Sequence, residues 1–164
     1  MDFTVSPSDD ILAKFAVQRE RVLHDFGVDV SCLLVDEAQF LTEGQVDDLL
    51  RIAIQEDVPV LAYGIRTDFQ TVAFPGSRRL LEVAHSLEEL KTICRCGRKA
   101  MFNARKIDGR FVFDGDQVAI DQGSVTYESL CGACYLDESG GILNNGWRPK
   151  VDFSYTGGPD ADFS

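Results

Sequence analysis

Two close pairs of cysteines constrain the fold of this chain more than any other feature of its sequence. One residue separates Cys94 from Cys96, and two residues separate Cys131 from Cys134. Four thiolates complete the tetrahedral coordination of Zn²⁺ and leave no position open for a substrate, so the spacing predicts a structural zinc site. The metal would fix both ends of a segment, residues 97–130, that is too small to bury a core of its own. The alternative is four unrelated free thiols, because the one-residue gap of the first pair is shorter than usual.

Composition and charge are those of an ordinary globular protein and narrow the choice of partners. The chain has 164 residues, 45% of them hydrophobic, and a formal net charge of −11. Nucleic acids and anionic membranes attract basic surfaces, so we expect neither as a partner. The longest uncharged apolar run, Val58–Ile65, is far shorter than the roughly 18 residues of a membrane-spanning helix. The acidic N-terminus lacks the profile of a secretion signal, so we expect a cytoplasmic protein in which the fifth cysteine, Cys32, is a small core residue.

The first half of the chain alternates between helix and strand. Ser8 is expected to cap a helix that ends at Gly27. A buried strand over Val28–Val35 follows, then a helix behind the capping box Thr42–Gln45, then a second buried strand over Val58–Tyr63. Strand, helix and strand in this order predict an α/β fold with a parallel sheet.

The second half changes from helices to short strands. Helices are expected over Ser77–Ala84 and Ser86–Leu90, and then strands over Phe111–Phe113, Gln117–Ile120 and Val125–Leu130. We call the small β-rich unit between the cysteine pairs the lasso module, residues 91–136. The predicted organisation is an α/β core over residues 1–90, the lasso module, and a disordered tail over residues 137–164, which is rich in glycine and polar residues.

An acidic pair follows the first predicted strand directly. Asp36 and Glu37 leave a hydrophobic strand at its carboxyl end, where α/β sheets bind ligands. There an aspartate can hold Mg²⁺ and a glutamate can take a proton from an attacking hydroxyl. The alternative is an ordinary solvated loop or helix cap. Four aromatic residues near these loops could stack on a nucleobase or simply pack in the core: Phe40, Phe69, Phe74 and Tyr127.

Taken together, these residues resemble the zinc-containing thymidine kinase family of bacteria and animal cytosol. The matching stretches are LLVDEAQFL (Leu33–Leu41), YGIRTDF (Tyr63–Phe69), ELKTICRCGRKA (Glu89–Ala100) and Tyr127–Cys134. They cover roughly Val28 to Tyr135, and the one-residue gap of the first cysteine pair is similar to the bacterial branch. The resemblance implies a partial P-loop-kinase-like (RecA-like) parallel sheet with helices, joined to the zinc-bound lasso module.

The resemblance also implies an activity and a role for each matching residue. The reaction is transfer of the γ-phosphoryl group of ATP to the 5′-hydroxyl of thymidine with Mg²⁺, in nucleotide salvage. Glu37 would be the base, Asp36 would support Mg²⁺, and the segment Asp36, Glu37, Ala38 and Gln39 would border the ATP phosphates. Phe40, Phe69, Phe74 and Tyr127 would enclose the nucleoside, and the backbone around Val118 and Ile120 would read the base edge. The family resemblance further implies a homotetramer that is inhibited by the end-product triphosphate.

One family motif has no counterpart in these residues. The family begins with a strand and a Gly-x-x-x-x-Gly-Lys-Ser/Thr loop that holds the β- and γ-phosphates. The 164 residues contain no such motif, so we expect an N-terminally truncated member whose chain alone lacks kinase activity. Two rival hypotheses are a zinc-knuckle adaptor without enzymatic activity and a helicase-like ATPase, the latter suggested by the Asp36–Gln39 stretch. Zinc binding without thymidine binding would favour the adaptor, and the acidic charge counts against the helicase.

Overall fold

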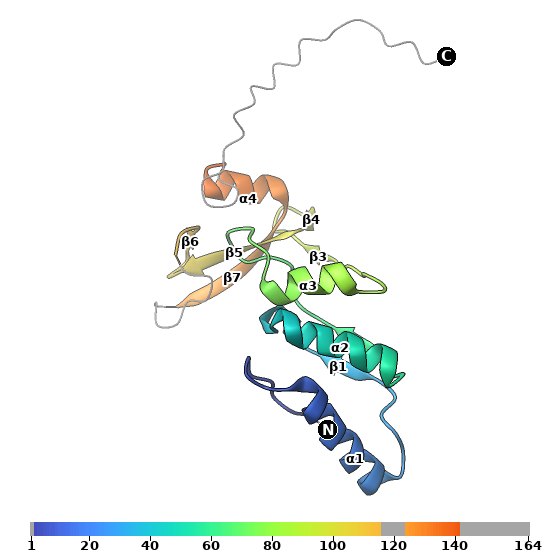
Figure 1. Ribbon diagram of the computed structural model, residues 1–164. Helices are drawn as coiled ribbons and strands as arrows, with labels where there is room; N and C mark the ends of the chain where they lie inside the picture. The colour runs from blue at the N-terminus through green and yellow to red at the C-terminus, as the bar shows by residue number, and fades with distance from the viewer. Residues whose placement is uncertain (1, 116–123, 142–164) are drawn as a thin grey trace, which may run out of the picture.

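The computed structural model describes residues 2–115 and 124–141 of the chain. An α/β part comes first and an antiparallel β part follows (Figure 1). The first part consists of α1 (Ile11–Phe26), β1 (Leu33–Val35), the short 3-10 helix η1 (Ala38–Phe40), α2 (Glu43–Gln55), β2 (Val60–Ala62) and α3 (Pro75–Val83). The second consists of β3 (Thr92–Ile93), β4 (Lys99–Ala100), β5 (Phe102–Ile107), β6 (Arg110–Val112), β7 (Val125–Leu130) and α4 (Gly132–Ser139). The mixed α/β class predicted from the sequence is confirmed.

The strands β1 and β2 form a two-stranded parallel sheet, connected by α2. The paired residues begin with Leu33 opposite Val60. The ladder begins there because Pro59 has no N–H to donate, although its carbonyl oxygen accepts the N–H of Leu33 at 2.8 Å. Both strands are therefore shorter than the predicted ranges Val28–Val35 and Val58–Tyr63, while their parallel pairing is as expected.

One face of this sheet is covered and the other is exposed. The covered face joins a core of buried residues from α1, η1 and the residue after it, α2, and the segment just before β2: Ile11, Phe15, Ala38, Leu41, Val46, Leu49, Ile52 and Val58. On the opposite face Leu34 and Leu61, which are partners in the register, are 67% and 43% exposed. The prediction of strands buried on both faces is therefore wrong for the described residues. Cys32, expected in the core, is exposed, because it precedes the ladder and no described element covers it.

Helix α1 begins and ends at specific capping residues. The carboxylate of Asp10 accepts the N–H of Ala13 at 2.9 Å, so Asp10 caps the helix and the predicted cap at Ser8 is wrong. The cap shifts because Ser8 belongs to a turn that precedes the helix, in which the N–H of Asp9 donates to the carbonyl oxygen of Ser6. Gly27 ends the helix as predicted, with φ of 67° and its N–H bonded to the carbonyl oxygen of Leu23.

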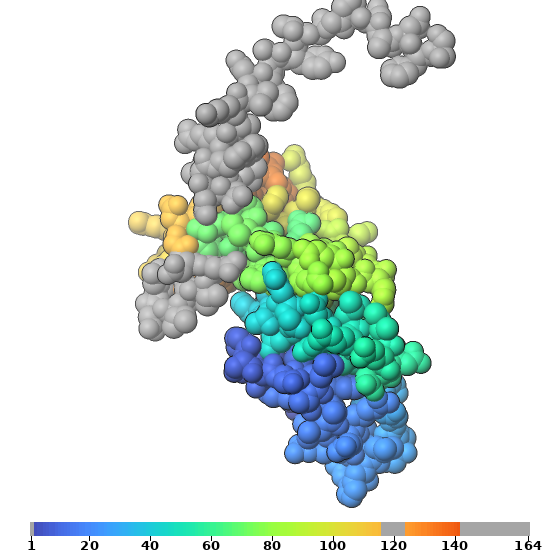
Figure 2. Space-filling model, in the orientation of Figure 1, coloured from blue at the N-terminus to red at the C-terminus, as the bar shows by residue number. Residues whose placement is uncertain are grey.

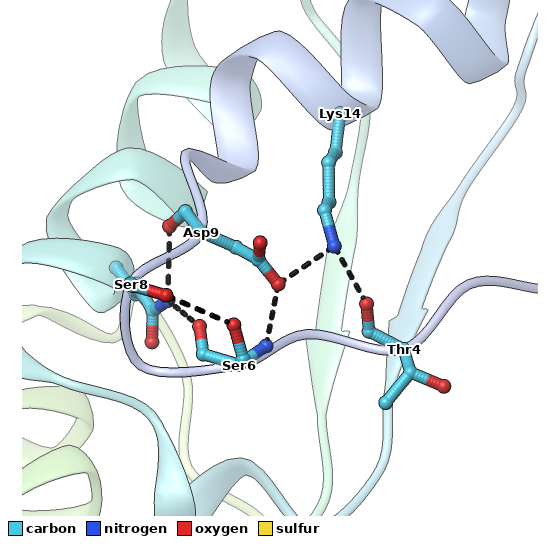
Figure 3. A network of polar contacts seen from close by, with 6 residues as sticks. Thr4, Ser6, Ser8, Asp9 and Lys14 are labelled. Carbon is cyan, nitrogen blue, oxygen red and sulfur yellow. Dashed lines mark hydrogen bonds and ion pairs between the residues drawn. The ribbon is translucent and has the colours of Figure 1, made fainter.

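Figure 3 shows the polar contacts that hold this turn. The carboxylate of Asp9 accepts the N–H of Ser6 and the ammonium group of Lys14, each at 2.6 Å, and Lys14 also donates to the carbonyl oxygen of Thr4 at 2.9 Å. The Lys14 contact is the largest cause that lowers the pKa of Asp9 to about 2. From α2, the buried side-chain amide of Gln45 donates to the carbonyl oxygens of Ser6 (2.8 Å) and Asp9 (3.1 Å). The turn before α1 is thus bonded to α2.

The amino end of α2 carries the predicted capping box. The N–H of Gln45 donates to Oγ1 of Thr42 at 3.2 Å, and the N–H of Thr42 donates to Oε1 of Gln45 at 3.0 Å. This reciprocal pair satisfies two backbone donors that a helix end otherwise leaves unbonded. The capping-box prediction is therefore confirmed.

The antiparallel part has its own hydrophobic core. Its main sheet has the strand order β6-β5-β7, and β3 and β4 form a separate hairpin. The buried residues of this core are Cys94, Ala100, Ala104, Leu130, Cys131 and Tyr135. In Figures 1 and 2 this part lies at one end of the described chain and α1, in dark blue, lies at the other, with α2 and α3 between them.

The remaining sequence predictions for this half have mixed outcomes. α3 and β7 form where helix and strand were expected. The helix predicted over Ser86–Leu90 does not form, because its apolar residues Leu87 and Leu90, 63% and 72% exposed, pack against no surface of the described residues. α4 continues to Ser139, beyond the predicted start of the tail, while residues 142–164 and the strand predicted over Gln117–Ile120 lie outside the described residues. None of the described helices has the length and hydrophobicity needed to cross a membrane.

Candidate functional site

The four cysteines predicted as metal ligands come together in the lasso module. Their Sγ atoms all lie within 4.8 Å of one another. The Sγ of Cys96 is 3.6 Å from that of Cys94 and 3.5 Å from that of Cys131. A disulfide requires about 2.05 Å, whereas sulfurs placed ~2.3 Å from a tetrahedral zinc ion are about 3.8 Å apart. The residue types and the spacing therefore fit a structural four-thiolate zinc site and not a pair of disulfides.

Local backbone geometry brings each cysteine pair into place. Gly97, with φ of 84°, turns the chain after Cys96, so that its N–H donates to the carbonyl oxygen of Cys94 at 2.8 Å. Cys131 is the N-cap of α4, and Cys134 lies in the first turn of that helix. One pair therefore comes from the β3–β4 hairpin and the other from the start of a helix.

Hydrogen bonds around the sulfur atoms shift the pKa values of the cysteine thiols in opposite directions. The backbone N–H groups of Cys96 and Cys131 lower the pKa of the Cys94 thiol to about 6, which favours the thiolate that a metal requires. Hydrogen bonds to Cys96 and Cys131 raise the pKa of Cys134 to about 12. Outside the cluster, Arg95 forms ion pairs with Glu138 of α4 and, at 3.6 Å, with Glu128 of β7, so the two cysteine pairs are also linked by charge.

The acidic pair lies at the carboxyl end of the parallel sheet, as predicted. Asp36 and Glu37 follow β1, and both are exposed. Glu37 has φ of 51°, a conformation that is uncommon outside glycine and costs of order 1 kcal/mol. Its N–H donates to the carboxylate of Asp36 at 2.9 Å, and the side-chain amide of Gln39 donates to its carboxylate. The backbone and a neighbouring amide together orient the Glu37 side chain.

Two glycines hold the η1 turn that carries these residues. A Cβ at Gly64, just after β2, would lie 2.5 Å from the side-chain oxygen of Gln39. A Cβ at Gly76, in the first turn of α3, would lie 2.6 Å from the carbonyl oxygen of Ala38 and 2.7 Å from that of Leu41. At Gly76 the close atoms are all backbone, so only glycine fits there, whereas at Gly64 a side chain would displace the Gln39 amide. The N–H of Ala38 also donates to the carbonyl oxygen of Tyr63 at 2.8 Å, so η1 is joined to the end of β2.

A shallow groove opens beside this turn. It has a volume of about 510 Å³ and is lined by Gln39, Phe40, Leu41, Thr42, Glu43, Gly44, Phe74 and Pro75. Phe40 is 56% exposed, and its ring meets the buried ring of Phe74 edge to face, with centroids 5.6 Å apart. The groove therefore combines an exposed aromatic surface with the first residues of α2, directly after the Asp36–Gln39 segment.

Comparison with known proteins decides the family. A family model described as thymidine kinase matches residues 10–135, which include the acidic turn, the groove and all four cysteines. The chain belongs to the thymidine kinase family. Its resemblance to that family, inferred above from four short stretches, is thus confirmed.

Bacterial relatives agree with this assignment. The thymidine kinase of Chromobacterium violaceum is 45% identical over 135 residues, which are 76% of this chain and 72% of the relative. That of Mesorhizobium japonicum is 47% identical over 133 residues, 80% of this chain and 62% of the relative. That of Legionella pneumophila strain Paris is 55% identical over 103 residues, 62% of this chain and 48% of the relative. Against the last two, the chain spans less than two thirds of the relative's length.

The thymidine kinase family resemblance assigned six residues to the nucleoside, and the structure brings only some of them together. Phe40 and Phe74 share the groove. Phe69 is 1% exposed and lies under the guanidinium of Arg105, whose Cζ is 3.7 Å from the ring centroid. Tyr127 lies on β7, opposite Arg105 in the sheet, and is 56% exposed. Val118 and Ile120 lie outside the described residues. The nucleoside roles of all six stay predictions.

The sequence analysis missed the residues that pack against the acidic turn and support it. Gly64 and Gly76 shape the η1 turn, and Gln39 bonds both Glu37 and the N–H of Ile65 (3.2 Å). A glycine at the second position of a helix, directly after a proline, was the available signal for Gly76, because glycine is unfavourable in a helix unless packing requires it.

Proposed function

We propose that these residues belong to a thymidine kinase that transfers the γ-phosphoryl group of ATP to the 5′-hydroxyl of thymidine. The observation that carries the proposal is the oriented acidic turn: Glu37, at the carboxyl end of β1, is held by Asp36 and Gln39 beside a groove with an exposed aromatic ring. Family membership and relatives named thymidine kinase support the same reaction.

Glu37 has the geometry of the general base in this proposal. Its exposed carboxylate accepts a hydrogen bond from the side-chain amide of Gln39, which leaves acceptor capacity for the 5′-hydroxyl proton. Oxygen Oε1 of Gln39 is bonded to the N–H of Ile65, so the amide cannot rotate without losing that bond. Gln39 thus keeps the base pointing in one direction.

Asp36 suits the support of a divalent cation. It offers an exposed carboxylate at the same edge of the sheet, and oxygen ligands of this type are those that Mg²⁺ prefers. Bound with ATP, Mg²⁺ would neutralise charge on the phosphates. Phe40 and Phe74 would pack against the nucleoside and exclude water from one side of it.

The four cysteines are proposed to bind a structural zinc ion that keeps the lasso module folded. The division of the chain at residues 90 and 136 and the cytoplasmic location, both expected from the sequence pattern, are further parts of the proposal. The assembly into a homotetramer is suggested by the family resemblance. Light scattering of the purified protein measures the assembly directly.

The test separates binding from turnover. Thymidine binding is measured by calorimetry on the 164-residue chain. Formation of thymidine monophosphate is measured on these residues extended at the N-terminus by a strand and a Gly-x-x-x-x-Gly-Lys-Ser/Thr loop, because turnover needs groups that hold the γ-phosphate and the 164 residues contain no such motif. We expect Glu37→Gln to lower kcat by ~100-fold or more while the thymidine KM changes little, as loss of a general base does.

An unchanged kcat in Glu37→Gln would show that another residue acts as the general base. A chain that binds zinc but shows no saturable thymidine binding would refute the proposed function and favour the zinc-knuckle adaptor. His24→Ala is the control, because His24 is an exposed residue at the far end of α1 and should leave turnover unchanged.

A further inference from the structure

A self-bonded loop reaches from the α/β part to the lasso module. Between the paired residues Thr67 and Ala73, the buried carboxylate of Asp68 accepts the N–H groups of Gln70 and Val72, both at 2.8 Å. The N–H of Asp68 in turn donates to the carbonyl oxygen of Val72 at 2.9 Å. These hydrogen bonds join the residues of the Asp68–Val72 loop to one another. Any movement of the loop would therefore carry all five residues together.

The lasso module holds this loop at two points. The hydroxyl of Tyr135 donates to the carbonyl oxygen of Phe69 at 2.6 Å, and both residues are 1% exposed. The side-chain amide of Gln70 donates to the carbonyl oxygens of Phe113 (3.3 Å) and Gly115 (3.0 Å), which follow β6. The ring of Phe69 meanwhile lies under the buried guanidinium of Arg105 from β5.

Tyr135 itself is firmly placed. It follows Cys134 in α4, its N–H donates to the carbonyl oxygen of Cys131 at 2.9 Å, and its ring lies 5.0 Å from that of Phe102 and 5.3 Å from that of Phe113.

The loop leads directly to the groove. Phe74 follows the paired residue Ala73, is the N-cap of α3, and has its ring against Phe40. A displacement of the loop would therefore move Phe74 and reshape the aromatic surface beside the acidic turn.

We propose that Tyr135 is a positioning residue for thymidine binding: its hydroxyl, acting through the carbonyl oxygen of Phe69 and the Asp68–Val72 loop, sets the position of Phe74 in the groove. The inference rests on the proposed function. It gives the helix that follows the second cysteine pair a direct part in the affinity for the nucleoside, although Tyr135 does not touch the groove.

The test compares two variants that each remove one buried hydroxyl from α4. Tyr135→Phe deletes the donor and keeps the ring contacts. Ser139→Ala is the matched control, since the Ser139 hydroxyl donates within the same helix to the carbonyl oxygen of Leu136. Thymidine affinity is measured by calorimetry at a temperature where all variants are folded, and zinc content and Tm are recorded for each.

We expect Tyr135→Phe to weaken thymidine binding roughly three- to tenfold, the range given by loss of one hydrogen bond. Ser139→Ala should lower Tm and leave thymidine affinity within about twofold. Gln70→Ala removes the hydrogen bonds to Phe113 and Gly115 and should weaken thymidine binding in the same way. This variant decides the test if Tyr135→Phe does not fold. Faster hydrogen exchange of the Asp68–Val72 amides in Tyr135→Phe would show the displacement without any nucleoside.

The outcomes separate this inference from the proposed function. Absence of thymidine binding by the unaltered chain refutes the proposed function. Binding by the unaltered chain, with affinity unchanged in both Tyr135→Phe and Gln70→Ala, overturns the positioning role alone. Equal weakening by Tyr135→Phe and Ser139→Ala also overturns it, because a general loss of helix stability would then explain both.

Discussion

Replacement of Gly76 by alanine tests how the η1 turn is held. Gly76 is buried at the second position of α3, and an added Cβ would lie 2.6 Å from the carbonyl oxygen of Ala38, 2.7 Å from that of Leu41 and 3.0 Å from that of Gln39. All three atoms belong to the backbone, so no side-chain rotation can relieve the contacts. α3 would have to move away from the turn, together with Phe74 and the Ser77 hydroxyl that donates to the carbonyl oxygen of Ile65.

The size of the effect follows from two opposing terms. Overpacking a well-packed site costs about 1–3 kcal/mol, and three fixed oxygens place this site near the upper value. Alanine is better than glycine in a helix by at most about 1 kcal/mol. We therefore expect Gly76→Ala to lower the free energy of unfolding by about 2 kcal/mol, which corresponds to a fall in Tm of roughly 4–8 °C for a chain of this size.

The chain offers a matched control for this experiment. Gly44 occupies the same second position in α2, and a Cβ there would meet nothing within 4 Å. Gly44→Ala should leave Tm unchanged or raise it slightly, because only the helix preference acts. Both variants are compared by thermal and urea unfolding. A Gly76→Ala variant as stable as Gly44→Ala would refute the close packing of α3 on the turn.

Two further predictions concern the metal and the stability of the protein at low pH. The unaltered chain should contain about one zinc per molecule by elemental analysis, and Cys131→Ser should lose it while Cys32→Ser, at the exposed cysteine, keeps it; full zinc in Cys131→Ser would exclude the four-ligand site. Two hydrogen bonds from Arg19, each 2.7 Å, lower the pKa of Asp29 from 3.8 to about 2, so its contribution to stability is present above about pH 4 and is lost as pH falls toward 2. The Tm difference between the unaltered chain and Asp29→Asn should therefore close over this range, and a gap that stays constant down to pH 2 would contradict the ion pair.

Features set by short-range sequence patterns could be predicted. The capping box of α2 depends on residues three positions apart, and the end of α1 depends on one glycine, Gly27. The parallel pairing of β1 with β2 follows from two apolar runs separated by one helix. In each case the stabilising contacts lie within one element or between successive strands, so the local pattern is enough to predict the structure.

Features that depend on distant packing could not be predicted. Cys32 and Leu34 are apolar residues in an apolar run, so the sequence favoured burial, yet no described element covers their side of the sheet. Residues 86–90 have the spacing of a capped helix, but a single turn is stable only when its apolar side finds a partner. The two glycines beside η1 acquire their role only when β2 and α3 approach the turn from opposite sides.

The candidate site was predictable to a similar degree. Spacing and residue type predicted that the four cysteines come together and that Asp36 and Glu37 follow β1, and the structure places them so, while the roles of Asp36 and Glu37 stay predictions. The residues that pack around the site, among them Gly64, Gly76 and Tyr135, were not predicted. The Tyr135 hydroxyl bonds Phe69 across a large distance in sequence, and nothing near either residue indicates the pairing.

The side chain of Gln45 has a consequence for the chemical ageing of the protein. Its oxygen accepts the N–H of Thr42, and its nitrogen donates to the carbonyl oxygens of Ser6 and Asp9. Glutamate would serve a capping box equally well, but a carboxylate has no hydrogen to donate and would direct negative charge at two carbonyl oxygens. Hydrolysis of this one amide would therefore keep the capping box of α2 and remove the two hydrogen bonds that join α2 to the turn before α1. Two residues that are interchangeable at a helix end are not interchangeable here.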